Sequence, residues 1–272
     1  MTGDDRLIPL ARWVFLPLAA VTTVFGPLLV LAPGQTAHYW SWPISPAMSA
    51  VWVGAGYTFG ACAISTMLVL NRWRTSILAI AATIPFAFAM AIATLLHLDR
   101  FALGTVRFGV WAAIYLLLPV GLPVIYALNR RSDPGIQPDD RLLPRSLRYT
   151  AGVAGVAIDL FAVALFVDPV GAAPVWPWVL TPLMAQVVAG WLMFFGTGAA
   201  MLLVEPRFRA VKPFLPCVAV WFAVLTIAAL GHLSDFTSAA ATVAFLGATV
   251  AVVVASLATL LFGRRLPKLA ER

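Results

Sequence analysis

Charged residues are scarce in this chain: only 11% of its 272 residues are Asp, Glu, Lys or Arg, whereas 62% are hydrophobic. A soluble globular domain carries about a quarter charged residues, because its surface must be wetted. The deficit therefore excludes a soluble globular domain, which would have nowhere to place so much apolar surface.

Cysteine and the familiar catalytic motifs are also scarce. The two cysteines, Cys62 and Cys217, lie in apolar runs without metal-type spacing, so we interpret them as small packing residues. The chain contains no phosphate-binding glycine loop, no Gly-x-Ser-x-Gly motif and no His-Glu-x-x-His motif. These absences argue against nucleotide-driven pumping and hydrolysis, make an enzyme the less favoured class, and leave no cofactor identified.

Apolar runs of about twenty residues dominate the sequence, and a helix of this length crosses a hydrocarbon core of about 30 Å. The runs lack the alternation of a β-barrel strand, so they predict helices. We therefore expect an all-α, polytopic integral membrane protein with eight transmembrane helices. The expected spans are 13–32, 47–70, 76–97, 108–128, 149–167, 182–204, 214–233 and 239–262.

Basic residues fall almost entirely between alternate spans. With the N-terminus inside, sixteen of the 18 lie on the cytoplasmic side, and only Arg100 and Arg107 lie outside. By the positive-inside rule, this bias predicts that both termini are cytoplasmic, in a plasma membrane of the bacterial type. The net charge of +7 follows from this topology. It favours anionic lipid headgroups as partners and gives no indication of nucleic-acid binding.

The sequence matches itself at an offset of 136 residues that drifts to 135 and then 134, and Pro33, for example, aligns with Pro169. Such self-similarity indicates a duplicated unit. We expect two parallel four-helix repeats, at 1–131 and 148–272, joined by a cytoplasmic linker at 132–147. A solute path, if present, should then lie between the repeats, on a pseudo-two-fold axis along the membrane normal.

A tryptophan-rich loop on the outer side is the most distinctive repeated motif. Its tryptophans are Trp40, Trp42, Trp176 and Trp178. We interpret Ser45 and Thr181, each followed by a proline, as caps of the next helix, and the tryptophans as an aromatic belt at headgroup level. The alternative is a tryptophan-walled mouth for an extracytoplasmic solute or lipid chain.

All three histidines are expected on the outer side, with acidic residues nearby. The candidate outer-face site consists of His38, His97, His232, Asp99 and Asp235. Imidazoles assisted by carboxylates could ligate a transition metal or a haem iron. Because no ligand spacing such as His-x-x-x-His accompanies them, capping of helix ends is favoured over ligation.

Asp159 is the only carboxylate near the middle of an expected span, and it aligns with Thr23. An ionised aspartate at the bilayer centre costs about 2.5 to 3.5 kcal/mol, so this side chain should face the bundle interior, be protonated or have a partner. Two interpretations stay open: a functional proton or solute contact, and a buried, neutral, hydrogen-bonded aspartate.

Three functions therefore compete. The leading hypothesis is a permease or channel-like protein for a small solute or a lipid, with a path between the repeats, because the duplication and Asp159 favour it. The second is a membrane subunit that binds a metal or haem through histidines at the outer face. The third is a non-catalytic partner of another membrane protein. The fold alone cannot decide among these, because one architecture supports many activities.

Overall fold

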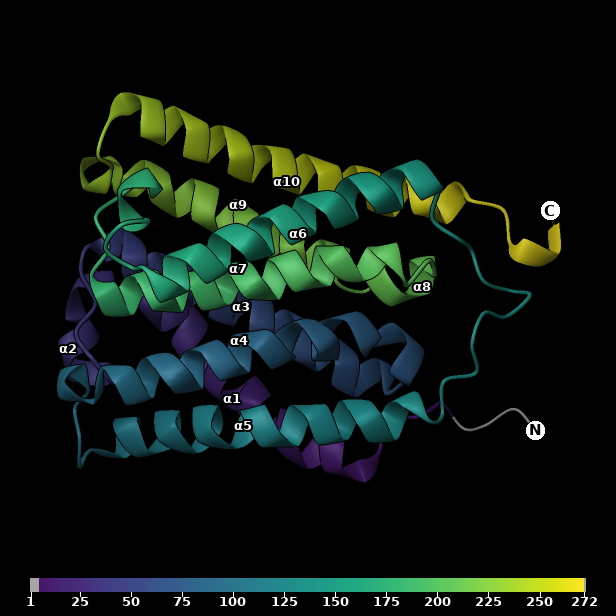
Figure 1. Cartoon of the computed structure of the whole chain (residues 1–272), viewed down its shortest axis with the longest axis horizontal. Coiled ribbons are helices and arrows are strands. Elements are labelled where there is room, and N and C mark those ends of the chain that lie inside the picture. Colours follow the sequence, from purple (N-terminus) through teal and green to yellow (C-terminus); the bar gives the residue numbers. More distant parts are fainter. Residues whose placement is uncertain (1–4, 272) are drawn as a thin grey trace.

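The computed structural model describes residues 5–271, which are helical without any strand. Its long helices lie side by side along the longest axis (Figure 1). Seven helices are long and apolar enough to cross a membrane, which indicates an integral membrane protein. They are α1 (Pro9–Leu31), α3 (Ala47–Leu70), α4 (Ile77–Leu96), α5 (Val106–Arg130), α6 (Arg145–Val167), α7 (Pro182–Ala200, extended by a 3-10 turn to Leu203) and α10 (Ala239–Arg265).

The expected span at 214–233 corresponds to α9 (Leu215–Gly231), which has only 17 residues. Its length is at the lower limit for crossing the hydrocarbon core, which takes about 20 residues. Two short helices lie in loops at opposite ends of the molecule, α2 (Thr36–Tyr39) and α8 (Phe208–Val211) (Figure 1). We call these ends the α2 end and the α8 end.

Helix hairpins from the two parts of the chain pack against each other. Consecutive helices pair as α1 with α3, α4 with α5, α6 with α7 and α9 with α10. Across the chain, α3 packs against α9, and α4 packs against α7. The segments 1–131 and 148–272 therefore share their central packing.

Aromatic rings fill the space among α3, α4, α7 and α9. The ring of Trp191 on α7 lies 4.4 Å from that of Phe86 and 4.9 Å from that of Trp221, measured between centroids. A Cβ atom at Gly56 of α3 would stand 2.7 Å from the Trp191 ring, so only glycine fits there. Small residues of this kind let membrane helices approach closely, and here the approach is between α3 and α7.

The two helices that follow the tryptophan loops are capped differently. The Thr181 hydroxyl accepts a hydrogen bond of 3.2 Å from the Met184 amide at the start of α7, as expected. For Ser45 the expectation is wrong. The amide of Met48 in α3 donates instead to the Asp235 carboxylate, at 2.8 Å. The second half of the chain thus supplies the cap for a helix of the first half.

A buried ion network lies at the α8 end. Arg207, only 4% exposed, binds Glu205 at 2.6 Å and Asp133 at 2.7 Å. Burial alone would raise the pKa of Asp133, but hydrogen bonds from Arg207 and from the Gly135 amide outweigh it and lower that pKa below its ordinary value. The network attaches the segment 132–147 to the start of α8, because buried charges are tolerated only when they are paired.

Candidate functional site

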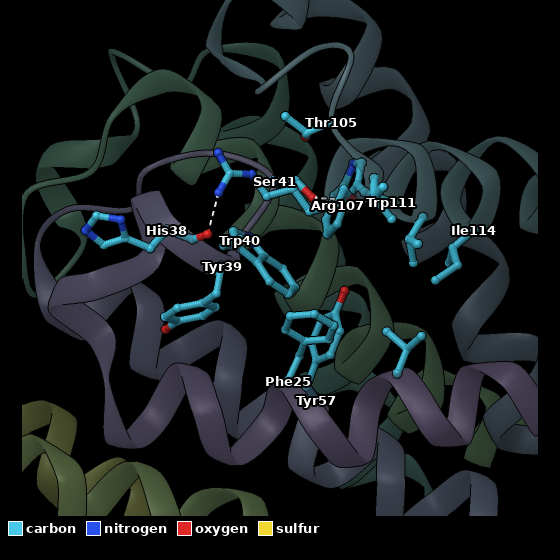
Figure 2. Close-up of a pocket in the computed structure, with 13 residues that line it drawn as sticks. Phe25, His38, Tyr39, Trp40, Ser41, Tyr57, Thr105, Arg107, Trp111 and Ile114 are labelled. Atoms are coloured by element: carbon cyan, nitrogen blue, oxygen red, sulfur yellow. Dashed lines mark hydrogen bonds between the residues drawn. The ribbon is translucent and has the colours of Figure 1, made fainter.

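A cavity of about 590 Å³ opens at the α2 end, among α1, α2, α3 and α5 (Figure 2). Its size lies within the range of small-molecule sites, about 300 to 1,000 Å³. Val21 of α1 and Val110 of α5 are among its lining residues. We call it the α2 cavity.

Aromatic side chains form the walls of the α2 cavity. Trp40 is buried at their centre, with its ring centroid 5.3 Å from those of Phe25 and Tyr57 and 5.6 Å from that of Trp111. Most of these ring pairs meet edge to face, which is a favoured aromatic arrangement. The rings support one another and give the cavity a fixed shape.

Arg107 holds a fixed position at the mouth of the α2 cavity. Its Nη1 donates to the carbonyl oxygen of Ala37, at 2.9 Å. It also donates to the carbonyl oxygen of His38, at 2.6 Å (Figure 2). Its Nε is buried without a hydrogen-bond partner, and so is Nε1 of Trp40. An unsatisfied buried donor costs about 1 to 3 kcal/mol.

The polar atoms of Tyr57 and Trp111, which also line the α2 cavity, are paired with groups behind the cavity wall. The hydroxyl groups of Tyr57 and Tyr115 hydrogen-bond to each other at 2.9 Å, and both side chains are buried. Nε1 of Trp111 donates to the Thr94 hydroxyl at 2.9 Å. These polar groups satisfy one another, so the α2 cavity combines a cationic mouth with an aromatic and apolar interior.

The aromatic-belt interpretation of the tryptophan loops is wrong for Trp40, Trp42 and Trp178, which are each at most 4% exposed. Trp176 is half-buried, and its ring lies 5.1 Å from that of Trp52. A signal for this burial was present in the sequence. Each loop motif recurs together with further aromatic residues at matched offsets, Phe101 with Phe236 and Trp111 with Phe245, and these residues contact the tryptophans.

His97 joins the two parts of the chain at the α2 end. Its Nε2 lies 3.0 Å from the Gln186 side-chain oxygen, and Gln186 donates in turn to the carbonyl oxygen of Phe166 at 3.0 Å. His97 also lines a second cavity of about 530 Å³ with Asp99. Asp99 is exposed and pairs with Arg100 at 3.0 Å.

The other outer-face candidates have separate positions. His38 is exposed at the mouth of the α2 cavity, His232 ends α9, and Asp235 caps α3. Between residues 5 and 271, no group of three His, Cys, Asp or Glu side chains could hold a metal ion. The structure therefore does not bring the three histidines together as a ligand set.

Asp159 lies half-buried between α6 and α7. One carboxylate oxygen accepts a hydrogen bond of 3.2 Å from the Thr197 hydroxyl, and the other is buried without a partner, directly against Gly196. Thr23 is exposed on α1, and its neighbour Thr22 faces Gly60 of α3 instead. Asp159 therefore sits inside the α6–α7 hairpin and not between the segments 1–131 and 148–272.

A further cavity of about 450 Å³, named here the α8-side cavity, has almost entirely apolar walls. It lies among α4, α6, α7, α9 and α10, towards the α8 end, and Leu147, Phe194 and Val252 are among its lining residues. It lacks the charged mouth of the α2 cavity, so its chemistry suits only apolar groups.

Comparison with known proteins identifies no relative: no family model, no curated protein and no solved structure matches the chain. The geometry of the α2 cavity therefore carries the functional interpretation.

Proposed function

We propose that this integral membrane protein binds a single-chain amphipathic anion in the α2 cavity, from the outer leaflet of a plasma membrane. The observation that carries the proposal is the fixed guanidinium of Arg107 at the mouth of a cavity walled by Trp40, Tyr57 and Trp111. Arg recognises phosphate and carboxylate groups through its planar set of donors. The aromatic interior suits a hydrocarbon chain.

The proposed topology has eight spans in two four-helix repeats, with both termini cytoplasmic. It counts α9 as a span, because α9 carries no charged residue and lies alongside the longer helices (Figure 1). The arrangement of charge supports the orientation, because basic residues gather at the α8 end. Several of them are exposed there and suit anionic headgroups: Arg130, Arg131, Arg145 and Lys212.

Two features define the ligand class. The cavity lies between α1 and α5, both of which expose most of their apolar surface, so a ligand can enter from the lipid. A volume of about 590 Å³ suits one hydrocarbon chain better than two. A lysophospholipid with an anionic phosphate, such as lysophosphatidylglycerol, has the required charge and shape.

Native mass spectrometry in an uncharged detergent tests this function directly. We expect saturable binding of one lysophosphatidylglycerol and at least tenfold weaker binding by Arg107→Ala, because a hydrogen bond to a charged group contributes about 1.5 to 3 kcal/mol. Arg100→Ala is the matched control, since Arg100 is an exposed arginine at the same end. Equal affinities of the native protein and Arg107→Ala would reject the proposed site.

A permease for the same ligand is a second candidate. It is favoured by the α8-side cavity, which lies at the opposite depth of the molecule. Aromatic rings fill the space among α3, α4, α7 and α9, so the proposed route passes through the two cavities instead. Asp159 is a candidate proton contact beside the α8-side cavity. Proteoliposomes should then accelerate transfer of fluorescent lysophosphatidylglycerol between leaflets, and Arg107→Ala or Asp159→Asn should slow it. Transfer at the rate of protein-free vesicles would reject the permease, but it would not contradict the proposed binding site.

A further inference from the structure

The two cysteines of the chain meet in the fold. Cys62 on α3 and Cys217 on α9 are 155 positions apart in sequence, yet their sulfur atoms lie only 2.8 Å from each other. No other cysteine exists in the 272 residues. Packing as small apolar residues explains why each is at least partly buried, but it gives no reason for the only two thiols to face each other.

The surroundings of the pair are apolar and differ for the two sulfurs. Cys217 is 1% exposed, and its thiol also points to the carbonyl oxygen of Pro213, at 3.6 Å. Cys62 is only half-buried. The α8-side cavity reaches Phe59, one turn from Cys62, and Val218, next to Cys217. A neutral reagent can therefore approach the pair through an apolar opening, with Cys62 as the more accessible thiol.

We propose that Cys62 and Cys217 form a redox site that closes to an intramolecular disulfide between α3 and α9. Sulfur atoms in a disulfide are about 2.05 Å apart, so closure takes a relative shift of about 0.8 Å from the observed separation. Side-chain rotation with a small helix adjustment supplies such a shift. The proposal is independent of the ligand of the α2 cavity.

The reaction needs a two-electron oxidant, and the azo compound diamide is the probe. The Cys62 thiolate adds to the nitrogen–nitrogen double bond of diamide. The Cys217 thiolate then attacks the Cys62 sulfur, forms the sulfur–sulfur bond and displaces the hydrazine. The hydrazine carries away the two electrons and the two thiol protons, so the step is balanced.

Closure would change the connection between the two parts of the chain. The contact of α3 with α9 is one of the two main helix contacts between segments 1–131 and 148–272, the other being α4 with α7. In the reduced protein, the linker is the only covalent connection between these segments. The disulfide would add a second connection inside the helix bundle and prevent α3 and α9 from separating.

The experiment uses the native full-length protein in detergent. It is treated with diamide, denatured, labelled with N-ethylmaleimide and analysed by intact mass and peptide mapping. We expect labelling to fall from two groups per chain to none, with a monomer mass lower by two hydrogen atoms and a linked peptide that contains both cysteines. Dithiothreitol should restore both labels.

Cys62→Ser and Cys217→Ala are the matched controls, and each should keep one maleimide label without a linked peptide. The decisive measurement is made on the native chain, so it does not depend on how well the variants fold. Full labelling of both cysteines after diamide, or a disulfide that joins two separate chains, would overturn the proposal.

Discussion

The two tryptophan loops begin from the same motif and end in different structures. In the first half, the loop of Trp40 surrounds a cavity with Arg107 at its mouth. In the second half, Trp178 packs against Phe236 and Phe245, with ring centroids 5.7 and 5.3 Å away. At the offsets of the internal match, Ala241 stands where the first half has Arg107.

A second substitution separates the loops in the same way, because Pro174 stands where the first half has His38. The shared aromatic residues build similar packing at both sites, whereas the polar residues occur at only one. If the two halves are repeats, as proposed, they share an aromatic scaffold, and only the first half adds the polar residues of the proposed binding site.

The largest expected difference between the halves lies at the α8 end, where Arg72 and Arg207 occupy matched positions. Arg207 is buried with two carboxylates, whereas Arg72 is 54% exposed and lies 3.7 Å from Asp5. Arg207→Ala should lower the free energy of unfolding by about 3 to 5 kcal/mol, because it leaves buried charges unpaired. Arg72→Ala should cost about 1 kcal/mol or less. Denaturant titration in mixed micelles measures both, and similar losses would contradict this contrast.

The next largest expected effect on stability comes from the contact of α6 with α7 in the second half. A Cβ atom at Gly155 would stand 2.5 Å from the amide nitrogen of Ala200 and the carbonyl oxygen of Gly196, whereas Gly247 has nothing within 4 Å of that position. Gly155→Ala should therefore cost about 1 to 3 kcal/mol through overpacking of α6 on α7. Gly247→Ala should leave stability unchanged or slightly raised. Thermal unfolding of the two variants measures both effects. A Gly155→Ala protein as stable as the native protein would show that α6 can move away from α7.

A smaller loss of stability is expected at the start of α3, where the two halves are in contact. Asp235 caps α3 across the halves, while Asp99 is exposed beside Arg100. Asp235→Ala should cost about 0.5 to 2 kcal/mol, typical of a lost helix cap. Asp99→Ala should have almost no effect, as for other exposed ion pairs. Unfolding midpoints of the two variants measure these losses. Equal shifts would show that Asp235 does not stabilise α3 as a cap.

The smallest expected effect is a pH dependence. The pKa of Asp133 is lowered in the folded protein, so its contribution to stability is present above its unfolded pKa of about 3.9 and is lost as the pH falls through the lower folded value. Asp133→Asn should therefore be less stable than the native protein at pH 6, and the gap should narrow towards pH 3. Melting curves across this interval test it, and a constant gap would mean that Asp133 does not titrate differently on folding.

The positions of the helices could be predicted from the sequence, but the packing of one helix against another could not. Apolar runs bounded by charge and proline located every long helix, because a membrane span is set by length and composition. Which helix packs on which depends instead on shape, as where Gly56 accommodates Trp191. Hydropathy carries no such information, so the packing of α3 on α9 and the meeting of Cys62 with Cys217 could not be predicted.

The candidate site was predicted only in part, because Trp40 and His38 were among the candidate residues and both line the α2 cavity. Trp40 was identified from the repeated motif, and a tryptophan-walled mouth was one of two interpretations. Arg107 was noted only as an exception to the distribution of charge, because its role depends on carbonyl oxygens of Ala37 and His38, seventy positions away in sequence. Contacts of that range are set by the tertiary fold.

The most direct test of the difference between the halves is photo-crosslinking with a lysophosphatidylglycerol that carries a diazirine in its chain. Mapping by mass spectrometry should place the labels that excess unlabelled ligand removes within 21–25 and 106–114, the α1 and α5 walls of the α2 cavity. Equal labelling, removed by unlabelled ligand, of the matched segments of α6 and α10, near Phe161 and Ala241, would contradict the proposal that only the first loop forms the binding site.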